Sequence, residues 1–298
     1  MMPVLALLSL LVVFMAVRAF LPAPAKLSDQ PAEQPGITTE GAVAEGDAAV
    51  EGSAESDETQ DATIASSDSR DADFAVDPSR TEWVFDQNDT KTVWLTFDDG
   101  PSENTERVLD ILDRYGIKAT FFVTGSRPDY YYMIKECYDR GHTIGLHTYS
   151  HDYETVYASK DAYWADLNAI GEVVKEQIGY VPCFIRFPGG SSNTISADYT
   201  PGIMTELAHD VVDAGYQYYD WDASCGDGAE HSAEELVAVT EEGPATAYTN
   251  VIFLMHDSGS KDTTVEALPQ IIEYFQSQGY GFAALDRETC VTHHGINN

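Results

Sequence analysis

The feature that most constrains this chain is a regular alternation of short β-rich runs and amphipathic helical patterns, from about Thr81 to the C-terminus. Helices between consecutive strands are typical of a parallel sheet, because each crossover helix returns the chain to the edge where the next strand begins. The pattern therefore predicts an α/β domain over residues 81–298. The predicted strands are Val93–Phe97, Ala119–Val123, Thr143–His147, Cys183–Phe187, Tyr216–Trp221, Val251–Met255 and Gly281–Leu285.

Five stretches with apolar residues at helical spacing lie between these strands, and a glycine lies at or just beyond the end of each one. Strands and helices in this order are compatible with an open parallel sheet or with an incomplete (β/α) barrel. The predicted helices are Thr105–Tyr115, Asp161–Ile178, Met204–Ala214, Ser232–Glu241 and Thr263–Gln278.

Residues 1–25 predict a signal peptide or an N-terminal anchor. Val4–Val17 is almost entirely aliphatic, but its length falls short of the roughly 20 residues that a bilayer-spanning helix needs. Ala23-Pro24-Ala25 matches the small-x-small pattern of a cleavage site. An uncleaved anchor that continues to Leu21 stays open as the alternative. Both forms predict a protein that is secreted or tethered to the outer face of the cytoplasmic membrane.

Residues 26–80 predict a disordered acidic linker. They carry a net charge of −11 and a single aromatic residue, Phe74. Such a segment buries too little apolar surface to offset the entropy lost on ordering. Residues 81–298 carry −24 of the total −34, so the domain itself is acidic. This charge argues against nucleic acid and anionic membrane surfaces as partners, which leaves the N-terminal segment as the predicted membrane contact.

Chemically active residues follow the first and third predicted strands, at the end where parallel α/β folds place their sites. Asp98 and Asp99 precede a Gly-Pro turn. We interpret the spacing of His147 and His151 as one helical turn with both imidazoles on one face. With Asp99 they form a two-histidine, one-carboxylate set that leaves coordination positions for water and substrate. Taken singly, each motif also fits a solvated turn or a chance pair of surface histidines.

The fourth and sixth predicted strands also end in residues with chemical potential. Arg186 is placed to fix a carboxylate by a charge-assisted hydrogen bond. Gly189 and Gly190 allow a close backbone approach and offer N–H groups to an oxyanion. His256 follows an apolar run, where a single histidine is more often structural than catalytic. The order of the four motifs is therefore more informative than any one of them.

In that order the chain resembles the NodB-like polysaccharide deacetylases, carbohydrate esterase family four. The resemblance covers about residues 92–285, and it implies a distorted, incomplete (β/α)7-type barrel with fewer than eight repeats. The matching segments are Thr96–Pro101, His147–His151, Arg186–Gly190 and Leu254–His256.

The resemblance implies a metal-dependent site. Asp99, His147 and His151 would hold a divalent metal, usually Zn²⁺, with Co²⁺, Ni²⁺ or Mn²⁺ as alternatives. Asp98 would be the catalytic base that takes a proton from water. Arg186 would orient Asp98 and limit the drift of its pKa.

The same resemblance assigns the other reacting groups. The N–H of Gly189 would help to hold the oxyanion, and His256 would protonate the leaving amine. Trp221 and Tyr149 are further candidates for substrate binding, because aromatic rings stack on sugars.

One motif departs from the family pattern, which commonly reads Asp-Ser-x-Asp-Trp. Aligned on Trp221, the first acid becomes Ser224 and the final tryptophan becomes Gly228, whereas Asp227 keeps the second acid. The resemblance implies that the first acid supports the catalytic histidine. We therefore expect Asp222 or Asp220 to substitute for it, with Asp227 as a further possible support of His256. The lost tryptophan should alter the wall of the substrate groove near Gly228.

The resemblance implies a hydrolase that removes N-acetyl groups from an extracellular polysaccharide and releases acetate. We expect peptidoglycan as the substrate because an exported, tethered enzyme meets it first. Chitin oligomers, poly-N-acetylglucosamine and acetylxylan stay open, as does a catalytically weak sugar-binding member of the fold. A two-histidine, one-carboxylate iron oxygenase is disfavoured, because that chemistry is expected on a jelly roll rather than on alternating strands and helices.

Four cysteines allow three full pairings, and none has the spacing of a metal site. We expect most of them to be free buried thiols. We also expect the protein to be a monomer, with a glycan strand as its partner. The four are Cys137, Cys183, Cys225 and Cys290.

Overall fold

The computed structural model describes residues 71–298 and confirms the predicted α/β fold. Every pair of named strands is parallel, and the strand order is β5-β4-β3-β2-β1-β7-β6, with β8 beside β1. The strands are β1 Thr92–Asp98, β2 Thr120–Thr124, β3 Thr143–Thr148, β4 Phe184–Ile185, β5 Gln217–Tyr218, β6 Ala223–Ser224, β7 Asn250–His256 and β8 Gly281–Phe282.

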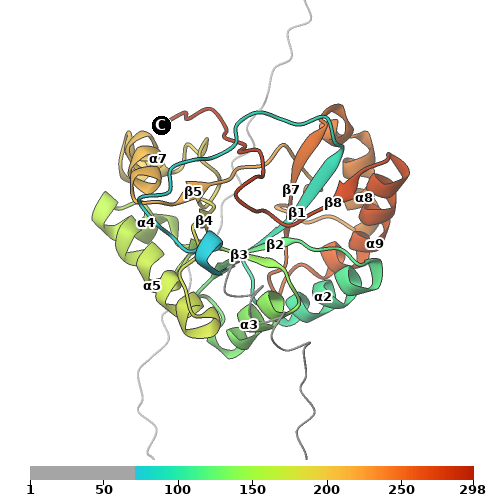
Figure 1. Ribbon diagram of the computed structural model, residues 1–298, viewed down its shortest axis with the longest axis horizontal. Coiled ribbons are helices and arrows are strands. Elements are labelled where there is room, and N and C mark those ends of the chain that lie inside the picture. Colours follow the sequence, from blue (N-terminus) through green and yellow to red (C-terminus); the bar gives the residue numbers. More distant parts are fainter. Residues whose placement is uncertain (1–70) are drawn as a thin grey trace, which may run out of the picture. The chain divides into compact units, whose positions relative to one another are not determined.

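Helices surround these strands on the outside of the curled sheet (Figure 1). The five predicted helices are present within one or two residues of their expected ends, and α3, α4 and α6 are additional. The helices are α2 Glu103–Tyr115, α3 Tyr132–Asp139, α4 Tyr153–Val156, α5 Lys160–Ile178, α6 Ser196–Tyr199, α7 Ile203–Asp213, α8 Ala233–Glu242 and α9 Asp262–Ser277.

The two-residue period of β1 decides which side chains enter the barrel. Val93, Leu95 and Phe97 pack in the large apolar cluster that the helices cover. Trp94 belongs to a smaller cluster on the opposite face, together with side chains from β2, β4 and β7. Since successive side chains alternate between faces, Asp98 ends the inward series that begins at Trp94. The alternation therefore aims a carboxylate into the barrel.

The barrel is incomplete because β5 and β6 are the two ends of the strand order. The C-terminal segment runs beside β5 and the residues that follow it, and the C-terminus lies beside α7 (Figure 1). The backbone N–H of Asp220 donates to the carbonyl of Thr292 at 2.9 Å. The ring of His293 stacks on Tyr218 with centroids 3.6 Å apart. These contacts attach the end of the chain to the edge of the sheet.

Residues 71–80 differ from the expected linker, because they pack on the domain. The ring of Phe74 meets Phe184 edge to face at 5.2 Å, and the N–H of Val76 donates to the carbonyl of Val181. The apolar side chains in this short stretch are enough to attach it, although the whole segment is acidic. The predicted leader and residues 26–70 lie outside the described residues and stay predictions.

Among residues 71–298, no helix combines the length and the apolar character that a membrane crossing requires. All four cysteines are free and buried, as expected. Burial raises the pKa of Cys137 and Cys225 well above the ordinary value of a thiol, which keeps both in the unreactive protonated form.

Candidate functional site

Four strand ends bring the predicted site residues together at the carboxyl end of the sheet. Asp98 ends β1 and pairs in register with His256, which ends β7. His147 lies in β3, and Arg186 directly follows β4. Because parallel strands share one polarity, their last side chains meet at one edge, as the sequence predicts.

Asp99, His147 and His151 form a compact group of three potential metal ligands. The Oδ1 atom of Asp99 lies 3.6 Å from Nε2 of His147 and 3.4 Å from Nε2 of His151. Ligand atoms at about 2.1 Å from a tetrahedral ion lie about 3.4 Å from one another, so this spacing fits a metal ion.

The backbone, rather than a helix, brings the two histidines together. His147 lies in a strand and His151 in the turn after it, so our interpretation of one helical turn is wrong. Thr148 and His151 adopt positive φ angles of 106° and 50°, which reverse the chain and place the imidazole centroids 5.0 Å apart. The buried carboxylate of Asp166 accepts from the N–H groups of Tyr149 and Ser150 and holds this turn.

Two polar atoms in the group support a metal site. Oδ1 of Asp99 is buried and has no hydrogen-bond partner within residues 71–298. Nδ1 of His147 lies 2.8 Å from the carbonyl oxygen of Arg186, which accepts only, so Nδ1 carries the hydrogen and the lone pair of Nε2 faces Asp99.

The electrostatics of the group agree with this geometry. Burial, with the charge of His151, lowers the pKa of His147 to about 3, which keeps this imidazole neutral as a metal ligand must be. The side chains of Asp99 and His151 are 27% and 31% exposed, so the group opens toward solvent. The residues present therefore fit a divalent metal with room for water and substrate.

Asp98 lies beside this group and pairs with Arg186. An Nη1 atom of the arginine donates to Oδ1 of Asp98 at 2.8 Å, and both side chains are almost fully buried. Burial raises the pKa of Asp98, and the charge and hydrogen bond of Arg186 oppose that rise. The other carboxylate oxygen lies 3.7 Å from Nε2 of His147, so Asp98 also borders the ligand group.

His256 is held by Asp227. Nδ1 of the imidazole lies 2.9 Å from Oδ1 of the carboxylate, whose other oxygen accepts from the N–H of His256 and from the hydroxyl of Thr264. Burial alone would lower the pKa of His256. The hydrogen bond and charge of Asp227, with the charges of Asp98 and Asp99, raise it instead to about 9.

Of the three acids considered as supports of His256, only Asp227 contacts it. Asp220 instead accepts from the N–H groups of Ser191 and His294, so the expectation for Asp220 is wrong. Asp222 accepts from the N–H of Ile252 and from the hydroxyl of Thr292 and so attaches the C-terminal segment. The expectation for Asp222 is therefore wrong. Asp222 and Asp227 lie on opposite sides of β6 in the sequence, and no spacing rule shows which of them contacts His256.

At Gly228 the structure has a hollow of about 360 Å³, where the family pattern has a tryptophan. Its walls include Gly228, Glu230, His231 and Lys261, and the ammonium of Lys261 donates to the carbonyl of Asp227. This hollow lies beside the support of His256, and the expected change of the substrate groove stays a prediction.

The remaining predicted residues line the same end of the barrel. Gly189 lies in a turn with a φ angle of 75°. The ring of Trp221 packs over the Arg186 guanidinium, 5.8 Å away, and against Gly190. Tyr149 is 38% exposed, and its ring covers Gly125. Both aromatic residues are therefore close to the site.

Sequence reasoning missed the residues that hold the Gly189 turn. The hydroxyl of the buried Tyr157 donates to the carbonyl of Pro188 at 2.8 Å. The buried Asp220 accepts from the N–H and the hydroxyl of Ser191. No spacing pattern links these residues, so only the fold identifies them.

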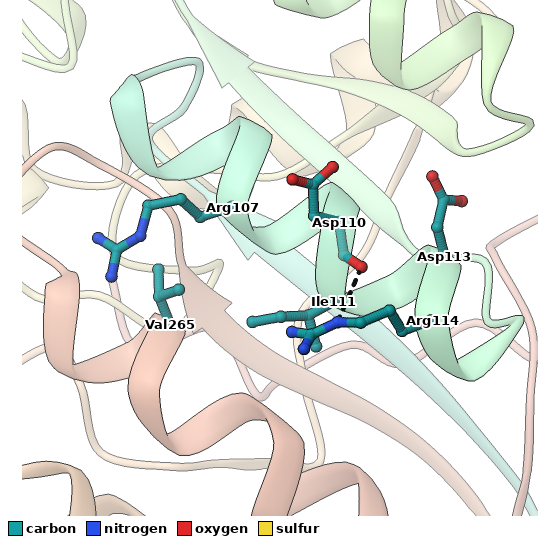
Figure 2. A pocket seen from close by; sticks show the side chains of 6 residues that line it. All are labelled: Arg107, Asp110, Ile111, Asp113, Arg114 and Val265. Atoms are coloured by element: carbon teal, nitrogen blue, oxygen red, sulfur yellow. Dashed lines mark hydrogen bonds between the residues drawn. The ribbon is translucent and has the colours of Figure 1, made fainter.

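A larger hollow, of about 600 Å³, lies over α2 and α9 (Figure 2). Its charged side chains already have partners: Arg107 pairs with Asp262, and Arg114 donates to the carbonyl of Asp110. It includes none of the residues that the strand ends bring together.

Comparison with known proteins supports the relation that the motifs suggest. A family model described as polysaccharide deacetylase matches residues 86–202. A peptidoglycan-N-acetylglucosamine deacetylase of Bacillus cereus is 28% identical over 221 residues, 71% of this chain and 74% of that enzyme. An enzyme of the same name from Listeria monocytogenes is 32% identical over 201 residues, which are 66% of this chain but 38% of that longer protein.

A solved structure extends this similarity to the fold. The catalytic domain of a peptidoglycan N-acetylglucosamine deacetylase from Eubacterium rectale is 43% identical and superposes with a TM-score of 0.69. The match covers 74% of this chain and 100% of that domain.

The ligand group predicts that the metal-free protein binds one divalent ion per chain. His151→Ala should weaken binding by roughly 100-fold or more, because even residues that only orient a ligand change affinity about 10- to 100-fold. Calorimetric titration with divalent ions measures both affinities. The exposed His209→Ala is the matched control and should bind like the wild type. Equal affinity of the His151 variant would exclude the group as the binding site.

The Asp227 contact predicts the ionisation of His256 in the metal-free protein. Its imidazole should titrate near pH 9 by NMR. Asp227→Asn should lower the midpoint markedly, since burial is then opposed only by the charges of Asp98 and Asp99. Asp222→Asn, which removes a neighbouring acid, should leave the midpoint unchanged. An unshifted midpoint in the Asp227 variant would assign the raised pKa to other charges.

The same contact predicts how stability varies with pH. The pKa of His256 is raised on folding, so the pair stabilises the fold fully below about pH 6.5 and loses this contribution as the pH rises through about 9. Asp227→Asn should therefore lower the unfolding free energy more at pH 6 than at pH 10 in urea titrations.

Proposed function

The chain belongs to the polysaccharide deacetylase family, and from this premise we propose that it removes N-acetyl groups from N-acetylglucosamine in peptidoglycan. One observation carries the proposal: the potential metal ligands lie beside a carboxylate and a histidine at one end of the barrel. The ligands are Asp99, His147 and His151, and the other two residues are Asp98 and His256. The related enzymes named as peptidoglycan deacetylases support the choice of polymer. The acidic surface also suits a neutral or amine-bearing glycan better than a highly anionic one.

In this proposal Asp99, His147 and His151 hold the metal, for which Zn²⁺ is our first choice. When bound, the ion supplies Lewis acidity to the attacking water and to the amide carbonyl. The neutral imidazole of His147 and the open side of the group suit both tasks.

Asp98 acts as the general base. Its carboxylate borders the ligand group and accepts one proton from water as the water oxygen bonds to the acetyl carbon. Arg186 holds the carboxylate in one orientation and favours its ionised form against the effect of burial. The base is therefore both placed and kept charged by one guanidinium.

His256 acts as the general acid. With its raised pKa it carries a proton at neutral pH, and it gives that proton to the amide nitrogen as the C–N bond breaks. The N–H of Gly189 holds the negative oxygen while the carbon is tetrahedral. Acetic acid and a free amine leave, and the acid gives its remaining water-derived proton to solvent to become acetate. The proton on Asp98 also passes to solvent, and His256 takes up a new one.

We place this reaction outside the cytoplasm. The predicted leader at residues 1–25 would export or anchor the chain, and the acidic segment after it would let the domain reach its substrate. The polymer in this proposal lies in the cell envelope, so the two inferences agree.

A substrate panel tests the proposal directly. The purified full chain, loaded with Zn²⁺, should release acetate from peptidoglycan fragments faster than from chitin oligomers, poly-N-acetylglucosamine or acetylxylan. Acetate release is the measurement, and the chelated protein is the blank. A preference for acetylxylan would indicate that the natural substrate is an acetyl ester rather than an acetamide. Failure to release acetate from any polymer with any common divalent metal would remove the catalytic proposal.

Replacement of the base separates chemistry from metal binding. Asp98→Asn should keep one metal per chain but lower kcat roughly 100- to 10,000-fold, the usual contribution of a general base. Metal analysis and acetate release measure the two effects. The control Asp139→Asn breaks only an exposed pair with Lys135 and should match the wild type. Retained turnover in the Asp98 variant would assign the base to another group.

A further inference from the structure

A tyrosine hydroxyl without an assigned role lies over Gly189. Tyr153 is the first residue of α4, two positions after His151. A Cβ atom placed on Gly189 would lie 2.7 Å from the hydroxyl oxygen of Tyr153 and 3.1 Å from the Cβ of Asn193. Glycine at this position therefore leaves room for the hydroxyl beside the turn whose N–H faces the developing negative charge in the proposed reaction.

Packing fixes the ring of Tyr153 between the ligand group and the Gly189 turn. It meets the imidazole of His151 edge to face, with centroids 5.8 Å apart and planes at 90°. The ring of Tyr157, whose hydroxyl donates to the carbonyl of Pro188, lies 5.7 Å from that of Tyr153. Within residues 71–298 the half-buried Tyr153 hydroxyl has no hydrogen-bond partner of its own, so its donor stays available.

The turn opposite this hydroxyl is equally well fixed. The N–H of Gly190 donates to the carbonyl of Phe187 at 2.8 Å, and the side chain of Asn193 donates to the carbonyl of Gly190 at 2.8 Å. Asp220 holds the next residue, Ser191, by two hydrogen bonds. Donors on two segments that are held by hydrogen bonds and packing are positioned before the reaction begins, which is the condition for effective oxyanion binding.

We propose, resting on the deacetylase function above, that Tyr153 is a further catalytic residue, whose hydroxyl donates a second hydrogen bond to the oxyanion beside the N–H of Gly189. As the water oxygen bonds to the acetyl carbon, an electron pair of the carbonyl moves to its oxygen. The phenol donates a hydrogen bond to that oxygen and keeps its proton. When the C–N bond breaks, the pair returns to form the carbonyl of acetate.

Tyr153→Phe tests the hydroxyl alone, because phenylalanine keeps the ring between His151 and Tyr157. We expect kcat to fall roughly 10- to 100-fold, less than for loss of a sole oxyanion donor, since Gly189 still donates. KM, metal content and melting temperature should stay at the wild-type values. Tyr132→Phe removes a hydroxyl from a side chain that is 60% exposed and is the matched control.

A binding measurement gives a readout that does not depend on turnover. A methylphosphonamidate analogue of N-acetylglucosamine carries a tetrahedral, negatively charged group in place of the acetyl carbon. Its Kd should rise in Tyr153→Phe by about the same factor as kcat/KM falls, because both report the tetrahedral state. The control variant should bind the analogue like the wild type.

The outcomes separate this inference from the function on which it rests. An active wild type with unchanged kcat in Tyr153→Phe overturns the role of the hydroxyl and leaves the deacetylase intact. Loss of metal or of thermal stability in the variant overturns it too, because the ring then acts only by packing. A lower kcat with unchanged affinity for the analogue also contradicts it. A wild type that releases no acetate removes both proposals.

Discussion

The buried ion pair between Arg186 and Asp98 is the interaction on which the site and the barrel interior both depend. The guanidinium is fully buried and donates to Asp98, to the hydroxyl of Thr96 and to the carbonyls of Tyr219 and Asp220. Its acceptors come from β1 and from the segment that follows β5. Removing one member of such a pair typically costs about 3–5 kcal/mol, because the other charge stays buried without compensation. Arg186, which holds the proposed base Asp98, is therefore also part of the core.

This pair explains how two adjacent carboxylates serve different partners. Asp98 still follows the strand and points inward to Arg186, whereas Asp99 has a φ angle of 72° and turns toward the histidines. Thr148 and His151 share this unfavourable backbone region, which costs of the order of 1–3 kcal/mol per residue and persists only where neighbours enforce it. Asp166 supplies part of that enforcement through its bonds to the turn. The strain lies where the three potential metal ligands converge.

The sequence predicts the parts of this architecture that follow from periodicity. Seven strands and five helices were readable from apolar spacing, and strand polarity placed Asp98, His147, Arg186 and His256 at one edge. The two-residue strand β6 was missed because Ala223 and Ser224 carry no β-branched or aromatic side chain. The choice of Asp227 over Asp222, and the position of Tyr153 on Gly189, depend on how loops fold back. Such contacts join residues that no local rule relates.

The charges at the barrel end indicate why an acidic site favours a metal ion and a protonated histidine together. Asp98 is compensated by Arg186 and Asp227 by His256, while Asp99 faces two imidazoles, of which that of His147 is kept neutral. Burial raises the pKa of the neighbouring Asp257 to about 7, and the charges of Asp99 and Asp98 add to this rise. A divalent ion at Asp99 would make the local electrostatic potential positive. An oxyanion that forms there would then meet positive charge, although the domain as a whole is acidic.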